Sequence, residues 1–273
     1  MIDILVIGSG PAGCSAAITA RKRGKEVLVI SSGQGALAKA ASVQNYPGFP
    51  ELSGAELLQR MQAHAAAMGA QFREGTVHQI LAGDDRFGVS LGADFEEAHR
   101  IILCTGARQP KLLPGEERLL GRGVSYCGTC DGMLYRKKKV AVIAEGPEAG
   151  SEARFLAGIC REVHWYGKPD TSLDERILQH PVVVREILGT DHAEALSAED
   201  GTAAYDGIFI FREATAYTVL LPELRTENGC IVVGRNMQTS VPGVFAAGDC
   251  TGAPLQAAKA VGEGCIAAIS ASL

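Results

Sequence analysis

The sequence predicts an α/β fold built on parallel sheets, and three observations lead to this class. A strand, a glycine-rich loop, a helix and a second strand follow one another within residues 2–30. Another apolar strand, at 139–143, begins a similar pattern in the middle of the chain. A further strand, within 240–249, ends in Gly-Asp near the C-terminus. Short apolar strands that alternate with helices are typical of parallel sheets covered on both faces.

Size and composition fit one large or two medium globular domains. The chain has 273 residues, of which 47% are hydrophobic and 21% are charged. Its net charge of −5 gives no reason to expect nucleic-acid binding, because phosphate recognition needs a basic face. The N-terminus lacks the basic start of a signal peptide, and no apolar run approaches the ~20 residues of a membrane helix. We therefore expect a cytoplasmic protein without a membrane partner.

The N-terminal segment contains a complete dinucleotide-binding pattern. The apolar run Ile2–Ile7 predicts a buried strand, Cys14–Arg23 a helix, and Glu26–Ile30 the next strand. The loop between the first strand and the helix, Gly8-Ser9-Gly10-Pro11-Ala12-Gly13, matches G-x-G-x-x-G. In this context the motif favours a bound dinucleotide over a glycine turn that binds nothing.

Each glycine of this loop has a chemical reason. Gly8 makes the tight turn, Gly10 lets the backbone approach a pyrophosphate, and Gly13 lets the helix pack closely on the strand. The helix N-terminus then offers free amides and a positive dipole end to the phosphates. The following strand departs from the pattern, because it ends in Ser31-Ser32 where an acid usually binds the ribose hydroxyls.

A second segment favours a flavin over a nicotinamide at this site. The strand at 240–249 ends in Gly248-Asp249, where a carboxylate can bind a ribityl hydroxyl and the glycine allows close backbone contact. The stretch from Leu255 to Gly264 then opens a helix whose N-terminus can point at the flavin ring.

Among eight cysteines, only Cys127 and Cys130 are paired at short range. A C-x-x-C at a helix start can close a redox-active disulfide, and Asp131 directly after it can act as general acid–base. The alternative is half of a zinc site, which we disfavour because the sequence has no second pair to complete four ligands. We expect the six others to be reduced, buried residues: Cys14, Cys104, Cys160, Cys230, Cys250 and Cys265.

With these motifs in place, the chain resembles the low-molecular-weight thioredoxin reductases over nearly its whole length. The landmarks, in order, are Gly8–Gly13, Asn45-Tyr46-Pro47-Gly48, Thr105-Gly106-Ala107, Gly123–Gly132 and Gly248-Asp249. The resemblance implies two Rossmann-like three-layer domains, the second inserted in the first. The FAD domain would comprise 1–114 and 223–273, and the central domain with the disulfide 115–222.

The resemblance also implies the partners and roles of the site. Cys130 would face the flavin, Cys127 would attack the disulfide of a thioredoxin-like protein, and the enzyme would be a homodimer. Because the central domain carries the cysteines, they can face both the flavin and the partner only through domain rotation or partner-induced opening. We expect hinges near Leu113–Gly115 and Glu227–Gly229. The implied FAD-binding residues are Gly8, Ser9, Gly10, Pro11, Ala12, Gly13, Ser31, Asn45, Val77, Thr105, Gly106, Gly248, Asp249, Gln256 and Ala257.

The central domain departs from the family where NADPH should bind. After the strand at 139–143 the loop reads Ala144-Glu145-Gly146-Pro147-Glu148-Ala149. Ala144 replaces the first glycine, Glu145 and Glu148 bring negative charge to the pyrophosphate position, and Pro147 lacks an amide donor. The paired arginines that grip the 2′-phosphate are missing at 167–169, and the later Gly-x-x-Pro-Asn element is replaced by 211–215.

These losses resemble the variants without a working NADPH site, which take electrons from ferredoxin or a reduced deazaflavin. We expect ferredoxin as the donor. One alternative keeps NADPH or NADH at a degenerate site, and another is a flavin-bound redox sensor without turnover. The basic run 136–139 predicts either a docking surface for a protein partner or a solvated turn. The apolar run 217–221 either fills the lost NADPH site or packs in a core.

Overall fold

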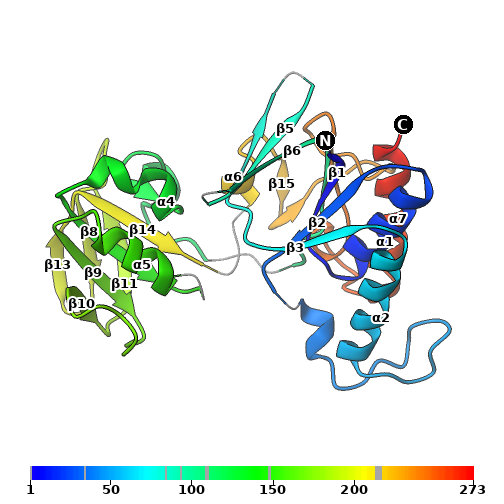
Figure 1. The fold of residues 1–273 in the computed structure, drawn as a ribbon, viewed down its shortest axis with the longest axis horizontal. Helices are drawn as coiled ribbons and strands as arrows, with labels where there is room; N and C mark the ends of the chain where they lie inside the picture. Colours follow the sequence, from blue (N-terminus) through cyan, green and yellow to red (C-terminus); the bar gives the residue numbers. More distant parts are fainter. Residues whose placement is uncertain are drawn as a thin grey trace. The chain divides into compact units, whose positions relative to one another are not determined.

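The computed structural model describes residues 2–33, 35–83, 85–92, 94–107, 111–146, 149–212 and 217–273. The chain divides into two compact units, and the second lies in sequence between the two segments of the first (Figure 1). Unit 1 comprises 1–109 and 217–273, and unit 2 comprises 110–216. Both junctions precede the expected ones at 114/115 and 222/223.

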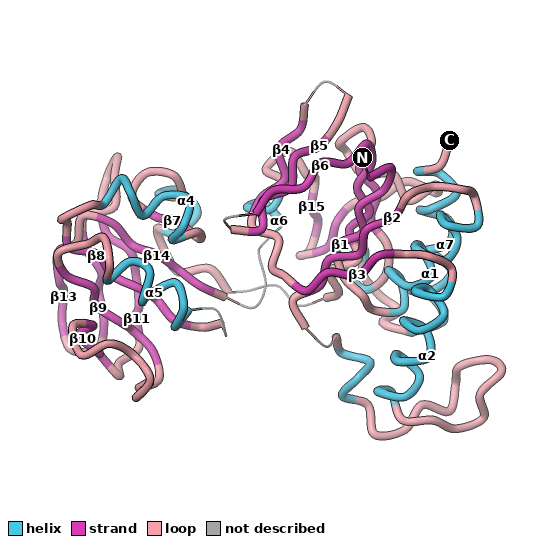
Figure 2. The backbone as a smooth tube through the Cα atoms, in the orientation of Figure 1, coloured by secondary structure: helices cyan, strands magenta, loops and turns pink. Residues whose placement is uncertain are grey.

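Unit 1 consists of a seven-stranded mixed sheet with helices (Figure 2). Its sheet order is β3-β2-β1-β6-β5-β4, and β17 pairs in parallel with β6. Strands β3, β2, β1 and β6 run parallel, whereas β4, β5 and β6 form an antiparallel meander. The elements are β1 (Ile2–Ile7), α1 (Pro11–Lys22), β2 (Val27–Ser31), η1 (Ala36–Lys39), α2 (Gly54–Ala67), β3 (Gln71–Glu74), β4 (Gln79–Ala82), β5 (Phe87–Leu91), β6 (Asp94–Leu103), α6 (Tyr217–Leu220), β15 (Thr226–Glu227), β16 (Cys230–Ile231), β17 (Val244–Ala246), η3 (Asp249–Thr251) and α7 (Ala257–Ala271).

Strand β1 lies in the middle of this sheet, which explains its unbroken apolar run. Ile4 pairs in register with Val27 of β2, and Leu5 pairs with Ile101 of β6. Leu5 belongs to the core on one face of the sheet, and Ile4 to the core on the other face, which α1 and α7 cover. A strand buried on both faces gains nothing from alternating polar residues. The predicted strands and the helix at 14–23 are present with small shifts at their ends.

Close packing of α7 against the first turn of α1 helps to position the glycine loop. A Cβ on Gly264 of α7 would lie 2.2 Å from the carbonyl oxygen of Ala12. Several buried alanines of both helices complete this contact, among them Ala16 and Ala267. The small side chains therefore bring the C-terminal helix directly onto the first turn of α1.

Unit 2 contains a five-stranded parallel sheet with order β10-β9-β8-β14-β7 and a three-stranded antiparallel sheet, β11-β12-β13. One core joins residues of both sheets, and a second lies between the parallel sheet and α5. The elements are α3 (Glu116–Leu119), β7 (Val124–Ser125), α4 (Gly128–Asp131), η2 (Gly132–Tyr135), β8 (Lys139–Ala144), α5 (Ala149–Ala157), β9 (Glu162–Gly167), β10 (Ile177–His180), β11 (Val184–Leu188), β12 (Ala195–Ala198), β13 (Gly201–Ala204) and β14 (Gly207–Phe211).

Neither segment that we expected to bend lies at a junction between the units. Pro114 accepts a hydrogen bond from the amide of Ile187 over 2.9 Å, within unit 2. Asn228 and Gly229, with φ of 52° and 74°, form the tight turn between β15 and β16 in unit 1. Both segments are therefore fixed inside one unit. None of the helices in the described ranges has the length and apolar character that crossing a membrane requires.

Candidate active site

The glycine loop of unit 1 has the geometry that a pyrophosphate site needs. Gly8 has φ of 110°, and a Cβ there would lie 2.1 Å from the carbonyl oxygen of Cys104. A Cβ on Gly13 would lie 1.9 Å from the carbonyl oxygen of Gly8. By contrast, a Cβ on Gly10 would meet no described atom within 4 Å. The first and third glycines are thus required for chain packing, and Gly10 leaves open space beside the backbone.

The start of α1 fits a bound diphosphate. Gly10 is its N-cap, no side chain caps it, and its first turn has no acidic residue. At the next strand end, the Oγ1 of Thr105 is buried without a hydrogen-bond partner among the described residues. A buried hydroxyl without a partner, next to a helix start without a side-chain cap, is the feature of a site that a polar ligand completes. The residues present therefore fit the dinucleotide part of FAD.

The turn with Asp249 is held by two residues of α7 to which we gave no role from the sequence. The Nζ of Lys259 donates over 2.8 Å to the carbonyl oxygens of Gly248 and Gly252. The Oε2 of Glu263 accepts from the amide of Gly248 over 2.8 Å and lies 3.0 Å from Lys259. Their spacing of four residues on a predicted helix was the available signal.

The carboxyl of Asp249 itself is half-buried in this turn. Its pKa is raised above the ordinary value, first because burial disfavours the charged form, while Lys259 opposes this shift and Glu263 adds to it. A carboxylate with such a pKa gains from a hydroxyl donor, which is the kind of group expected of the flavin chain.

The remaining expected FAD residues fall into different surroundings. The Nδ2 of Asn45 donates to the Oε1 of Gln256 over 2.8 Å, which joins two segments far apart in sequence. Val77 is 5% exposed and contributes its side chain to the core. The Oγ of Ser31 donates to the carbonyl oxygen of Gly33. Ala257 is the first residue of α7.

Gln62 of α2 is a further residue to which the sequence analysis gave no role. Its Nε2 donates to the carbonyl oxygen and to the Oγ of Ser9, over 3.2 and 3.1 Å. These bonds connect the second residue of the glycine loop to α2. The sequence had no signal for this contact, because Gln62 lies on a separate helix.

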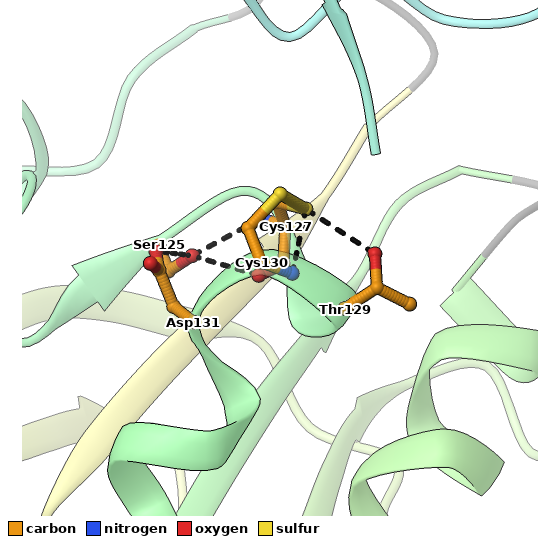
Figure 3. The surroundings of a disulfide bond; sticks show 5 residues. All are labelled: Ser125, Cys127, Thr129, Cys130 and Asp131. Atoms are coloured by element: carbon orange, nitrogen blue, oxygen red, sulfur yellow. Dashed lines mark hydrogen bonds between the residues drawn. A yellow bond between two sulfur atoms is a disulfide. The ribbon is translucent and has the colours of Figure 1, made fainter. Parts of the chain in front are cut away.

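In unit 2, Cys127 and Cys130 form a disulfide at the start of α4 (Figure 3). Cys127 is 8% exposed, whereas Cys130 is exposed. The amide of Cys130 donates to the Sγ of Cys127 over 3.1 Å, and the Oγ1 of Thr129 lies 3.4 Å from the same sulfur. Hydrogen bonds to a sulfur favour its thiolate after reduction, so these contacts favour the Cys127 thiolate.

Asp131 is oriented by a serine before the disulfide (Figure 3). The Oγ of Ser125 donates to the Oδ2 of Asp131 over 2.7 Å. The Oγ of Ser125 also accepts a hydrogen bond from the amide of Cys127 over 3.1 Å. The expected catalytic residues Cys127, Cys130 and Asp131 are therefore brought together with Ser125 and Thr129 in one short loop and helix.

The other six cysteines are free. Cys14, Cys104 and Cys250 are buried, but Cys160, Cys230 and Cys265 are only partly buried, so the expectation of buried residues holds for three of the six. Burial raises the pKa of the Cys14 and Cys250 thiols to about 12 and that of Cys160 to about 11. Such thiols are poor nucleophiles near neutral pH.

At Glu145, the loop after β8 takes part in an ion-pair network. The Nε of Arg212 donates to the Oε2 of Glu145 over 2.5 Å, and its two terminal nitrogens bind both carboxylate oxygens of Glu116. Glu116 is fully buried, and the Arg212 side chain is 7% exposed. A Cβ on Gly146 would lie 2.8 Å from the carbonyl carbon of Arg212. Pro147, Glu148 and residues 213–215 lie outside the described residues.

The apolar run 217–221 is not part of this loop. Tyr217, Leu220 and Leu221 are buried in a core of unit 1, and the hydroxyl of Tyr217 donates to the carbonyl oxygen of Gly106 over 2.8 Å. Core packing, one of the two expectations for this run, is therefore confirmed.

Comparison with known proteins decides the family. The model of the pyridine nucleotide-disulphide oxidoreductase family matches residues 2–264. The chain belongs to this family. Within it, the chain is similar to thioredoxin reductases of Listeria innocua, at 32% identity over 97% of this chain and 91% of the relative, and of Aquifex aeolicus, at 35% over 98% and 91%.

Among solved structures, the chain is similar to a ferredoxin-flavin thioredoxin reductase from Clostridium acetobutylicum. The identity is 39%, the TM-score is 0.88, and the match covers 99% of this chain and 96% of that one. These similarities confirm the two-domain α/β fold of the thioredoxin reductase type. The chain is thus a disulfide oxidoreductase of thioredoxin reductase type, an enzyme class whose cofactor is FAD.

Proposed function

We propose that this enzyme reduces thioredoxin-like proteins through Cys127 and Cys130 and receives its electrons from ferredoxin rather than from a nicotinamide nucleotide. In this proposal, the Gly8–Gly13 loop, Thr105 and Asp249 hold the FAD. When bound, it supplies two electrons to the disulfide. The proposal places the enzyme in the cytoplasm, since free cysteines suit a reducing compartment.

The observation that carries the choice of donor is the network around Arg212. In a nucleotide site this sheet edge should offer backbone amides and positive charge to a pyrophosphate. Here the guanidinium is bound on all sides by Glu116 and Glu145. One cation against two carboxylates leaves net negative charge, so a phosphate approaching this edge is repelled.

Two further observations support the donor. The ferredoxin-flavin thioredoxin reductase of Clostridium acetobutylicum is similar over 99% of this chain. The motif losses at 144–149, 167–169 and 211–215 are distributed over three strand ends of the same sheet. Loss at three places favours a site that no longer binds the nucleotide over one that tolerates a single change.

The different exposure of the two cysteines supports different roles for them. Cys130 is exposed, so its sulfur is the one that an external group such as a flavin can reach. Cys127 has the hydrogen bonds that favour a thiolate, which suits the attack on a partner disulfide. Because Cys127 is 8% exposed in the oxidised form, the proposal requires that its sulfur become more accessible after reduction.

The surface that follows the disulfide helix supports a protein substrate. Met133 and Leu134 of η2 are 58% and 69% exposed, although both are large apolar residues. Arg136, Lys137 and Lys138, directly after them, are exposed as well, whereas Lys139 begins β8 and is half-buried. An apolar pair with an adjacent cationic segment suits an acidic protein partner with an apolar contact area.

The experiment that tests this function reconstitutes the electron path. The FAD-loaded protein is mixed with reduced ferredoxin and an oxidised thioredoxin-like protein, and the thiols that appear on the partner are counted. We expect partner thiols with ferredoxin, none with NADPH or NADH, and none with Cys127→Ser. No partner thiols with any donor, from a protein that binds FAD, would contradict the proposal and favour a redox sensor.

The roles of the two cysteines are tested by trapping. We expect Cys130→Ser to form a stable mixed disulfide with the partner through Cys127, because the resolving thiol is missing. Cys127→Ser should not trap the partner, and Cys230→Ser, which removes a partly buried free cysteine, serves as the control. Trapping by Cys127→Ser instead would reverse the assignment.

A further inference from the structure

Ser125 occupies a fixed position beside the disulfide. It is the last residue of β7, is 4% exposed, and pairs in parallel register with Phe209 of β14. Phe209 is fully buried in the core below α5. A serine hydroxyl in such a place has little access to bulk water, so its hydrogen bonds come mainly from the protein.

Three polar groups lie within hydrogen-bond distance of this hydroxyl. The amide of Cys127 donates to Ser125 Oγ over 3.1 Å, Asp131 Oδ2 lies at 2.7 Å, and the carbonyl oxygen of Cys127 lies at 3.2 Å (Figure 3). A hydroxyl has one hydrogen to give and two lone pairs. It can therefore donate to Asp131 or to the Cys127 carbonyl, but not fully to both.

This choice matches the two states of Asp131. When the carboxyl is ionised, the Ser125 hydrogen points to Oδ2, where the bond is short and charge-assisted. When the carboxyl is protonated, its own O–H can donate to the second lone pair of Ser125, and the serine hydrogen turns to the Cys127 carbonyl. Both states are fully hydrogen-bonded without movement of a heavy atom, which lowers the cost of passing a proton.

We propose that Ser125 is a positioning residue that serves Asp131 in both of its protonation states and links them to the backbone of Cys127. This inference rests on the proposed role of Asp131 in thiol exchange. In the forward half-reaction the Cys127 thiolate attacks a partner disulfide and forms a mixed disulfide with it. The bond between the two partner sulfurs breaks, and the protonated Asp131 gives its proton to the partner thiolate that leaves. The Asp131 carboxylate then takes the proton of the Cys130 thiol, and the Cys130 sulfur attacks Cys127. The internal disulfide forms again as the second partner thiolate leaves.

A purely structural role for Ser125 makes a different prediction. The bond from the Cys127 amide to a serine two residues earlier is an ordinary turn contact. If it were the whole role, removal of the hydroxyl would slow every disulfide equally and would not change the pH dependence. The test must therefore separate reactions that need a proton donor from reactions that do not.

Two small disulfides provide this separation with the FAD-loaded, pre-reduced enzyme. An aromatic disulfide, dithiobis(nitrobenzoate), releases a stable thiolate and needs no acid, whereas oxidised glutathione releases a basic alkyl thiolate that does. Single-turnover rates are measured for both over a pH series. We expect Ser125→Ala to slow glutathione reduction roughly tenfold and to move the midpoint of its pH profile upward, because the carboxylate loses a donor. The rate with the aromatic disulfide should stay within about twofold.

Further variants make the outcome decisive. Ser125→Thr retains the hydroxyl and should restore the midpoint, and Ser125→Gly, which also removes the hydroxyl, replaces Ser125→Ala as the test if that variant does not fold. Ser172→Ala removes a hydroxyl that donates to Asp170 over 2.7 Å on the exposed surface of the same unit, away from the disulfide, so the midpoint should stay in place. Asp131→Asn should slow glutathione reduction more than Ser125→Ala does, relative to the aromatic disulfide.

Each result has one reading. If Ser125→Ala slows both disulfides equally, or leaves both pH profiles unchanged, Ser125 has no positioning role. If Asp131→Asn does not distinguish the two disulfides, the expected role of Asp131 as general acid–base in thiol exchange fails, whatever Ser125 does. A shifted midpoint in Ser125→Ala with a selective loss in Asp131→Asn supports both.

Discussion

The Nε of Arg212 donates to the Oε2 of Glu145 over 2.5 Å, and its terminal nitrogens bind the fully buried Glu116. Glu116 also accepts from the hydroxyl of Tyr126 and the amide of Leu113, both over 2.7 Å. The residue before Cys127 and the loop after β8 are thereby connected through one buried carboxylate. The edge where a nucleotide phosphate would bind has thus become part of the internal polar structure of unit 2.

This arrangement predicts a large loss of stability when Arg212 is removed. Arg212→Leu leaves the buried carboxylate of Glu116 without its cation, and we expect the free energy of unfolding to fall by ~3–5 kcal/mol. Arg176→Leu is the matched control, because Arg176 pairs with Asp174 on the surface and is 69% exposed. Its loss should be much smaller, because a solvent-exposed ion pair contributes little to stability. Urea unfolding followed by circular dichroism measures both, and equal losses would contradict this account of the network.

Helix packing behind the glycine loop gives a second prediction. A Cβ on Gly264 would lie 2.2 Å from the Ala12 carbonyl oxygen, whereas one on Gly262, in the same helix, would meet no described atom within 4 Å. We expect Gly264→Ala to destabilise the protein by ~1–3 kcal/mol and to lower its FAD content. Gly262→Ala should stabilise it by ~0.5–1 kcal/mol. Flavin absorbance per protein and the unfolding midpoint are the two measurements, and full FAD content in Gly264→Ala would contradict the prediction.

Asp249 gives a prediction with a defined pH dependence. Because burial raises its pKa, its ionised form opposes folding of the FAD-free protein, so its contribution is most favourable at low pH and is lost as the pH rises through the folded-state pKa. At pH ~7 the FAD-free Asp249→Asn protein should therefore be more stable than the wild type. The difference should close as the pH falls toward 3.8.

The same substitution should weaken FAD binding roughly tenfold, because a charge-assisted hydrogen bond is replaced by a neutral one. Urea unfolding of the deflavinated protein across the pH range and titration calorimetry with FAD check the two effects separately. An asparagine variant that is less stable at neutral pH would contradict the first, and unchanged affinity would contradict the second.

The exposed pair Met133 and Leu134 predicts a surface for the protein substrate. Replacing both by alanine should raise the KM for a thioredoxin-like protein roughly tenfold and leave kcat little changed. The rate with a small aromatic disulfide should not change, since it needs no docking surface. Leu178→Ala is the control, because Leu178 is 49% exposed but lies on the edge strand β10. A loss with both kinds of substrate would place the two residues in the chemistry and not in docking.

Much of this structure follows from local patterns. Gly13 is required by its contact with the Gly8 carbonyl inside the first βα unit, so the motif predicts the strand, the turn and the helix. The close approach of Gly8 to Cys104, at the end of β6, was not visible in the motif. The Cys127–Cys130 pair was likewise found from its spacing, because the two residues form one loop. Patterns with a period or a fixed spacing are visible in sequence because the contacts that they describe are local.

Contacts between distant segments could not be predicted in this way. Arg212 meets Glu145 and Glu116 from positions 67 and 96 residues away, and no pattern joins them. For this reason the sequence indicated that Glu145 repels phosphate but not that Arg212 binds it together with Glu116. Gln62 holds Ser9 across 53 residues for the same reason. The ion pair of Lys259 and Glu263 could be predicted in part, because their spacing of four residues on a helix is visible in the sequence. Their contacts with Gly248 could not be predicted.

The most direct test of the central claim follows the oxidised-flavin absorbance of the purified protein under anaerobic conditions. NADPH, NADH and chemically reduced ferredoxin are added in separate cuvettes, each with and without an oxidised thioredoxin-like protein. The account predicts prompt bleaching by ferredoxin, return of the colour when the partner is present, and no bleaching by either nucleotide. Prompt bleaching by NADPH would contradict it and would make this an ordinary NADPH-dependent thioredoxin reductase.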